Sequence, residues 1–108
     1  MLKGIIIENS LDDLDALGQL QVEDTRQEGD WTVHTVTAPH TQIPDIARCL
    51  KDGPWYMHFW DSEGDELIVV YKTRTFRASR TDPATLEGAK AHGRSIGIPE
   101  EELDFTTD

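Results

Sequence analysis

The chain has 108 residues, a length that predicts one domain, residues 1–108, with a core of its own. Its 21 acidic and 10 basic side chains give a formal net charge of −11, which disfavours binding to nucleic acid or to an anionic membrane. Cys49 is the only cysteine, so an intramolecular disulfide is excluded, and no apolar run approaches the ~20 residues that span a bilayer. The apolar part of the first residues is also too short for a signal peptide, so we expect a cytoplasmic protein.

The first half of the chain predicts two strand regions and two short helices. Residues 2–8 form a strand that is apolar on both faces and therefore central in a sheet. Ser10 has the character of a helix cap, and the helix that follows has one or two turns. Residues 19–38 predict a hairpin with a long loop, and residues 43–50 a short helix that ends before Gly53.

The second half predicts three more strands and the best helix, the strands covering residues 55–61, 67–72 and 75–78. Asp82 and Pro83 provide a cap and a first helical residue. Gly93 lies on the inner stripe of this helix, which suggests close contact with the sheet.

These elements together predict an α+β fold. Its sheet has five to six strands and is mainly antiparallel, because most neighbouring strands are joined by short turns. We expect the two main short helices to pack on one face of this sheet. Leu103 and Phe105 would dock the end of the chain on the core.

The most distinctive segment is a run of six large side chains, Trp55-Tyr56-Met57-His58-Phe59-Trp60. Strand side chains alternate between faces, so Tyr56, His58 and Trp60 share one face while the other three side chains suit a core. Histidine can act as an acid, a base or a metal ligand. Tyr and Trp supply the apolar wall and the hydrogen-bond donors of a small-molecule pocket. We expect His34 to join this site if its strand lies nearby. The alternative is a histidine satisfied within a mixed sheet face or a dimer interface.

The apolar character of both faces predicts self-association. Three short helices are too few to cover both faces of such a sheet, and each large apolar side chain left exposed forfeits roughly 1.5–3 kcal/mol. Ile6, His58, Trp60 and one of Val69 and Val70 would need cover. We therefore expect a homodimer that closes the second face.

A basic run stands out in this acidic chain, formed by Lys72, Arg74, Arg77 and Arg80 with no acid between them. It is where an anionic ligand is expected, with Arg74 and Arg77 as the candidate binding residues. The alternative is a solvated hairpin tip, or basic side chains that protect an edge strand from aggregation.

A metal site receives little support from the sequence. It would need His34, His58 and a carboxylate such as Glu8 or Asp61 to converge, and no paired histidine or cysteine spacing is present. Nucleotide-binding and nucleophile motifs are also missing from the sequence. We therefore expect no metal and no cofactor.

Four patches of the sequence resemble a known group of proteins: Leu2-Lys3-Gly4-Ile5-Ile6-Ile7-Glu8-Asn9-Ser10, Trp31-Thr32-Val33-His34-Thr35-Val36, Trp55-Tyr56-Met57-His58-Phe59, and the ending Gly97-Ile98-Pro99-Glu100-Glu101-Glu102-Leu103-Asp104-Phe105. The chain is similar in these patches to small uncharacterised bacterial and archaeal proteins of comparable length that end in the pattern Gly-Ile-Pro-x-x-x-Leu-Asp-Phe. The resemblance covers nearly the whole chain and implies a single stand-alone domain. It implies no activity and no site residues.

Two hypotheses of function follow. The first is a non-catalytic module that binds a small molecule or a protein partner and self-associates through its sheet. The second is a small enzyme in which His58 is the acid–base, Tyr56 assists as a donor and an arginine of the basic run anchors an apolar, anionic substrate. A third and weaker hypothesis is an accessory protein whose acidic surface engages a basic partner.

Overall fold

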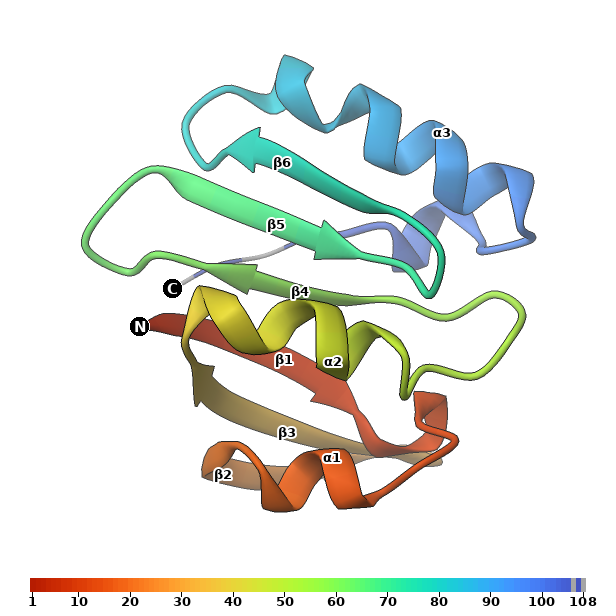
Figure 1. Cartoon of the computed structure of the whole chain (residues 1–108). Helices are drawn as coiled ribbons and strands as arrows, with labels where there is room; N and C mark the ends of the chain where they lie inside the picture. Colours follow the sequence, from red (N-terminus) through yellow and green to blue (C-terminus); the bar gives the residue numbers. More distant parts are fainter. Residues whose placement is uncertain (106, 108) are drawn as a thin grey trace.

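The computed structural model describes residues 1–105 and 107, which form an α+β fold around one open antiparallel sheet (Figure 1). The described residues contribute six strands, β1 (Leu2–Ile7), β2 (Gln21–Glu28), β3 (Trp31–Ala38), β4 (Met57–Trp60), β5 (Glu66–Val70) and β6 (Thr75–Ser79). Their order across the sheet is β2-β3-β1-β4-β5-β6. The predicted fold class and the antiparallel sheet are confirmed.

Strand β1 is central in the sheet, as its apolar sequence predicts. It pairs antiparallel with β3 on one side, where Ile6 lies opposite His34, and with β4 on the other, where Ile5 lies opposite His58. Strands β3 and β4 are therefore parallel to each other, and the chain between them must cross over β1. β2–β3 and β4–β5–β6 are joined by short turns, which is why each group is contiguous in sequence.

The described residues also form three short α-helices and four 3₁₀ turns. The helices are α1 (Asp15–Gly18), α2 (Ile43–Ala47) and α3 (Glu87–Ser95), and the 3₁₀ turns are η1 (Glu8–Ser10), η2 (His40–Gln42), η3 (Pro83–Leu86) and η4 (Glu100–Glu102). Asp82 caps η3 ahead of α3, as predicted, by accepting a backbone N–H. Ser10 does not cap α1, because its hydroxyl donates to a carbonyl of β1 and Asp13 accepts the first N–H instead.

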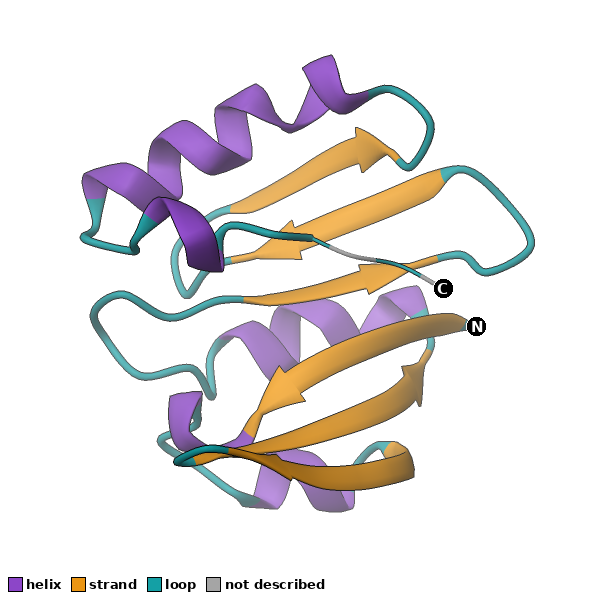
Figure 2. Ribbon diagram, turned by 180° about the vertical axis from the view of Figure 1, so that it is seen from behind, coloured by secondary structure: helices purple, strands orange, loops and turns teal. Residues whose placement is uncertain are grey.

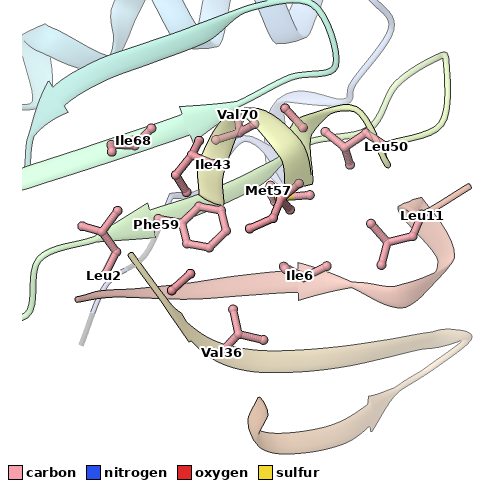
Figure 3. Close-up of a cluster of buried hydrophobic side chains, with 13 residues drawn as sticks. Leu2, Ile6, Leu11, Val36, Ile43, Leu50, Met57, Phe59, Ile68 and Val70 are labelled. Atoms are coloured by element: carbon pink, nitrogen blue, oxygen red, sulfur yellow. The ribbon is translucent and has the colours of Figure 1, made fainter. Parts of the chain in front are cut away.

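The first face of the sheet carries the larger core, which lies beneath α2 (Figure 3) and against which Leu17 of α1 packs. Met57 and Phe59 point into it, and Trp55 packs against its margin, as the alternation of the aromatic strand predicts. The ring of Phe59 lies directly over Gly4 of β1: a Cβ at Gly4 would be 2.3 Å from Phe59 Cδ1. A glycine in the middle of this strand is thus explained by the close approach of an aromatic ring.

The second face is closed over β4, β5 and β6 by the chain itself. Helix α3 and the segment 96–105 bury Trp60, Val69 and Tyr71, with Leu103 and Phe105 docked among them as predicted. Gly93 allows this approach, since a Cβ there would lie 2.5 Å from Leu103 Cδ2. The argument that a second copy must cover His58, Trp60 and Val69 is therefore wrong, because the C-terminal part of the same chain covers them.

The two main helices lie on opposite faces of the sheet rather than together on one face. Helix α2 packs in the first core, and α3 contributes Ala89 to the second. Figure 2 shows the second face from its own side, with α3 above, the C-terminal segment crossing near β4, and no helix in front of β1, β3 and β2. Part of this face, beside the C-terminal segment, is thus not covered by a helix. The candidate site lies along the border between the C-terminal segment and this uncovered part.

Candidate functional site

Tyr56, His58 and Trp60 form one row on the second face, as predicted. The His58 ring stacks on Trp60 with centroids 5.4 Å apart, and Tyr56 lies 6.3 Å from His58 on the other side. Phe105 closes over the row, with its ring 5.2 Å from Tyr56 and 6.2 Å from His58. His58 is 5% exposed and Trp60 3%, so most of the row is packed beneath the C-terminal segment.

His34 does not join this row. It lies opposite Ile6 of β1, whereas His58 lies opposite Ile5, and neighbouring residues of a strand point to opposite faces. His34 is buried on the first face, where its Nδ1 is 2.8 Å from the Thr25 hydroxyl and its Nε2 is 3.1 Å from Glu8 Oε1. Both ring nitrogens therefore have partners at the edge of the first core, and the two histidines do not converge.

The basic run does not gather into one site either. The guanidinium of Arg74 lies over the Phe76 ring, 4.6 Å from its centroid, and Lys72 lies 3.7 Å from Asp52. Arg77 points to the first face and donates to Glu66 at 3.0 Å. His40 contacts the same carboxylate, and both basic side chains line a cavity of about 300 Å³. Glu66 thus already occupies the place that an anionic ligand would take beside Arg77.

The second face contains a groove along the open edge of the C-terminal segment. Its larger part is a cavity of about 320 Å³, lined by Ile7, Trp31, Pro54, Trp55, Tyr56, Gly97, Ile98, Pro99 and Glu102. A smaller part of about 260 Å³ shares Ile7 and Tyr56 and adds Ile5, Arg26, Glu28, Val33, Met57, His58 and Asp104. We call the larger part the aromatic groove, because three aromatic rings line it.

The three rings of the aromatic groove come from two places in the fold. Trp31 begins β3, and Trp55 and Tyr56 precede β4. The two indoles meet edge to face, with centroids 5.5 Å apart and an interplanar angle of 83°. Trp31 is 36% exposed, one of the most exposed large apolar side chains among the described residues. These rings present an apolar wall to solvent, which is the typical lining of a small-molecule site.

The hydroxyl of Tyr56, which lines the groove, donates a hydrogen bond within the protein. It donates to the carbonyl oxygen of Glu102 at 2.6 Å and thereby ties η4 to the sheet. Burial, with smaller contributions from Tyr71, Asp104 and Glu102, raises the pKa of Tyr56 well above its ordinary value of 10.0. Tyr56 therefore stays protonated at neutral pH, and its hydroxyl hydrogen is engaged in the hydrogen bond to Glu102.

Sequence reasoning missed Trp31, Trp55 and Glu102 as lining residues, and it assigned Trp55 to the core face of its strand. The signal for Trp31 is the register of β3: Val33 lies opposite Ile7, so Trp31, two residues earlier, shares the face of Ile7. That register is set by pairing with β1 and cannot be obtained from β3 alone. Glu102 reaches the groove only because Leu103 and Phe105 dock the segment beside it.

The described residues contain neither a metal-binding cluster nor a membrane-spanning helix. Among residues 1–105 and 107, no group of three or more His, Cys, Asp and Glu side chains is arranged to hold a metal ion. No helix in that part of the chain has the length and apolar character to cross a membrane.

The fold and the groove define an α+β protein with an open antiparallel sheet and an aromatic groove beside its C-terminal segment. No protein family model, no curated protein and no solved structure matches the chain.

Proposed function

We propose that the protein is a non-catalytic binding module that takes a small, largely apolar ligand in the aromatic groove. The observation that carries this proposal is the convergence of Trp31, Trp55 and Tyr56 on one open cavity of about 320 Å³. Small-molecule sites have volumes of roughly 300–1,000 Å³ and combine apolar walls with few polar groups. The cytoplasmic location expected from the sequence is part of the same proposal.

An enzyme based on His58 finds less support. Its ring is stacked on Trp60 and covered by Phe105, and it borders only the smaller part of the groove. Arg74 and Arg77, the expected anchors for an anionic substrate, do not line the groove. A ligand in the aromatic groove would meet Tyr56, whose hydroxyl already donates a hydrogen bond to a carbonyl, so binding is favoured over proton transfer.

Self-association through the sheet is proposed only for the part of the second face that the chain itself leaves uncovered. The cover that a second copy was expected to provide over β4–β6 is provided by α3 and residues 96–105. What a second copy could still cover is the open strip next to Trp31, over β1, β3 and β2 (Figure 2). A dimer would therefore compete with a ligand for the same groove.

The three indole N–H groups provide a direct test. In a ¹⁵N-labelled sample the Trp31 and Trp55 resonances report on the groove, and the buried Trp60 resonance is an internal reference. We expect small fragments selected by NMR screening to shift the Trp31 and Trp55 signals and to leave Trp60 unchanged. A screen with neutral, cationic and anionic fragments in which no compound shifts either groove indole would refute the proposal.

Variants separate the groove from other exposed apolar surface. Trp31→Ala should abolish binding of the selected fragments, whereas Leu14→Ala should not, because Leu14 is even more open to solvent, at 55% exposed, but does not line the groove. Sedimentation of both variants and the parent at micromolar concentration addresses the second copy. A dimer that Trp31→Ala dissociates would assign the groove to self-association instead of to a ligand.

A further inference from the structure

We propose that the ligand of the aromatic groove is an organic cation, with an alkylated ammonium group held against Trp31, Trp55 and Tyr56. This inference rests on the proposed function and specifies the chemistry of its ligand. The faces of aromatic rings carry negative potential and attract cations within about 6 Å, and quaternary ammonium groups are recognised in this way by cages of aromatic side chains. The groove brings together three such rings from two segments of the chain.

The charges around the groove favour a cation over an anion. Among the described residues that line the aromatic groove, Glu102 is the only one with a charged side chain. The adjoining smaller part adds the carboxylates of Glu28 and Asp104 against the single guanidinium of Arg26, which lies 3.4 Å from Glu28. An anion would meet uncompensated carboxylates here, in a chain whose net charge is already −11.

Lys51 shows that an indole of the groove accepts a cation. Its ammonium nitrogen lies over the Trp55 ring, 5.9 Å from the centroid. Lys51 is not among the residues that line the groove, so a second cation could approach Trp55 from the groove. Lys51 would then repel that ligand while Glu102 attracts it, and removing these two charges should change the affinity in opposite directions.

The volume of the aromatic groove sets the size of the cation. About 320 Å³ corresponds to roughly ten water molecules. This is enough for a trimethylammonium head with a short chain attached. The same chemistry occurs in a free quaternary amine and in the side chain of a trimethylated lysine, so the test includes both sources.

The experiment compares three ligands with the same branched trimethyl head by titration with the NMR readout of Trp31 and Trp55. They are choline, its neutral isostere 3,3-dimethylbutan-1-ol and the anion 3,3-dimethylbutanoate. We expect choline to bind about tenfold more tightly than the alcohol, with the carboxylate weakest. A capped trimethyllysine amide and its unmethylated counterpart identify the source: preference for the trimethyllysine amide over choline points to a peptide, and the reverse to a free amine.

Charge variants test the cause of the preference. Glu102→Gln, which keeps the carbonyl that Tyr56 contacts, should weaken choline binding about threefold, and Lys51→Gln should strengthen it about twofold. Glu101→Gln is the matched control, because it removes the same charge from the neighbouring exposed residue that does not line the groove. It should change choline affinity less than Glu102→Gln does.

The outcomes separate this inference from the proposed function. If the alcohol binds in the groove as tightly as choline, or if Glu102→Gln weakens choline no more than Glu101→Gln, the cation assignment is refuted and the apolar groove stands. If neither choline nor the alcohol shifts the groove indoles while another fragment does, the cation assignment again falls alone. If no compound shifts them, both proposals fall.

Discussion

The contact between Gly4 and Phe59 allows a quantitative prediction about stability. In the variant Gly4→Ala, the new methyl carbon would lie 2.3 Å from Phe59 Cδ1 and 2.5 Å from Cε1. An ordinary carbon–carbon contact is ~3.5 Å, so the ring must retreat by about 1.2 Å. The backbone cannot yield easily, because β1 is hydrogen-bonded to β3 and β4 on both sides. Overpacking of this kind costs about 1–3 kcal/mol, which outweighs the ~0.5–1 kcal/mol that a Gly→Ala change otherwise gains.

Urea unfolding followed by circular dichroism measures this cost. We expect Gly4→Ala to lower the free energy of unfolding by about 1–3 kcal/mol at an unchanged slope against urea. Gly18→Ala is the control, since a Cβ at Gly18 would meet nothing within 4 Å. The same Gly4→Ala change in a Phe59→Leu background should cost less than half as much, because a smaller side chain opposes the methyl. A Gly4→Ala protein as stable as the parent would show that Phe59 does not pack on β1 as described.

The remaining predictions concern pH. Burial raises the pKa of Tyr71 to about 12, and its hydroxyl donates to the Ala89 carbonyl at 2.6 Å. Because the folded pKa lies above the ordinary value of 10.0, the stability from Tyr71 is present below pH 10 and is lost as the pH rises toward 12. Urea unfolding should show a smaller loss in Tyr71→Phe than in the parent, because Tyr56, whose pKa is also raised, is then the tyrosine that remains, and an equal loss in both proteins would contradict the assignment. Hydrogen bonds from Ser79 and Thr81 lower the pKa of Asp65 below 3.8. Its contribution should be present above pH 3.8 and disappear as the pH falls further, so the stability difference between the parent and Asp65→Asn should shrink in acid and a constant difference would contradict the assignment.

Local features of this fold could be predicted because their causes are local in sequence. The alternation of residues 56–60 gave both faces correctly, since the period of a strand does not depend on its partners. Trp55, which precedes β4, packs against the first core and also lines the groove. Asp82 and Pro83 gave the start of the last helical region, and Leu103 and Phe105 gave a docked end, because capping and apolar spacing are properties of short segments.

Features that depend on pairing between distant strands were missed. The alternation within β3 alone would allow His34 to share a face with His58. In the sheet, however, His34 pairs with Ile6 and His58 with Ile5, so the two histidines lie on opposite faces. The placement of α3 opposite α2 depends on which side the chain takes after β6, and that choice leaves no local signal. The basic residues lie close together in sequence. In the fold, Arg74 lies over Phe76 on the second face and Arg77 donates to Glu66 on the first, so the two do not form one site.

The position of β1 ties the whole molecule together. The β2–β3 hairpin and the β4–β5–β6 meander are each complete units of neighbouring sequence, and the only strand between them in the sheet is β1. Neither unit can detach without breaking its own ladder with β1, and its loss would leave an unpaired edge of β1 beside the other unit. The domain should accordingly unravel in a single cooperative step, with the amide hydrogens of β1 among the slowest in the protein to exchange with solvent.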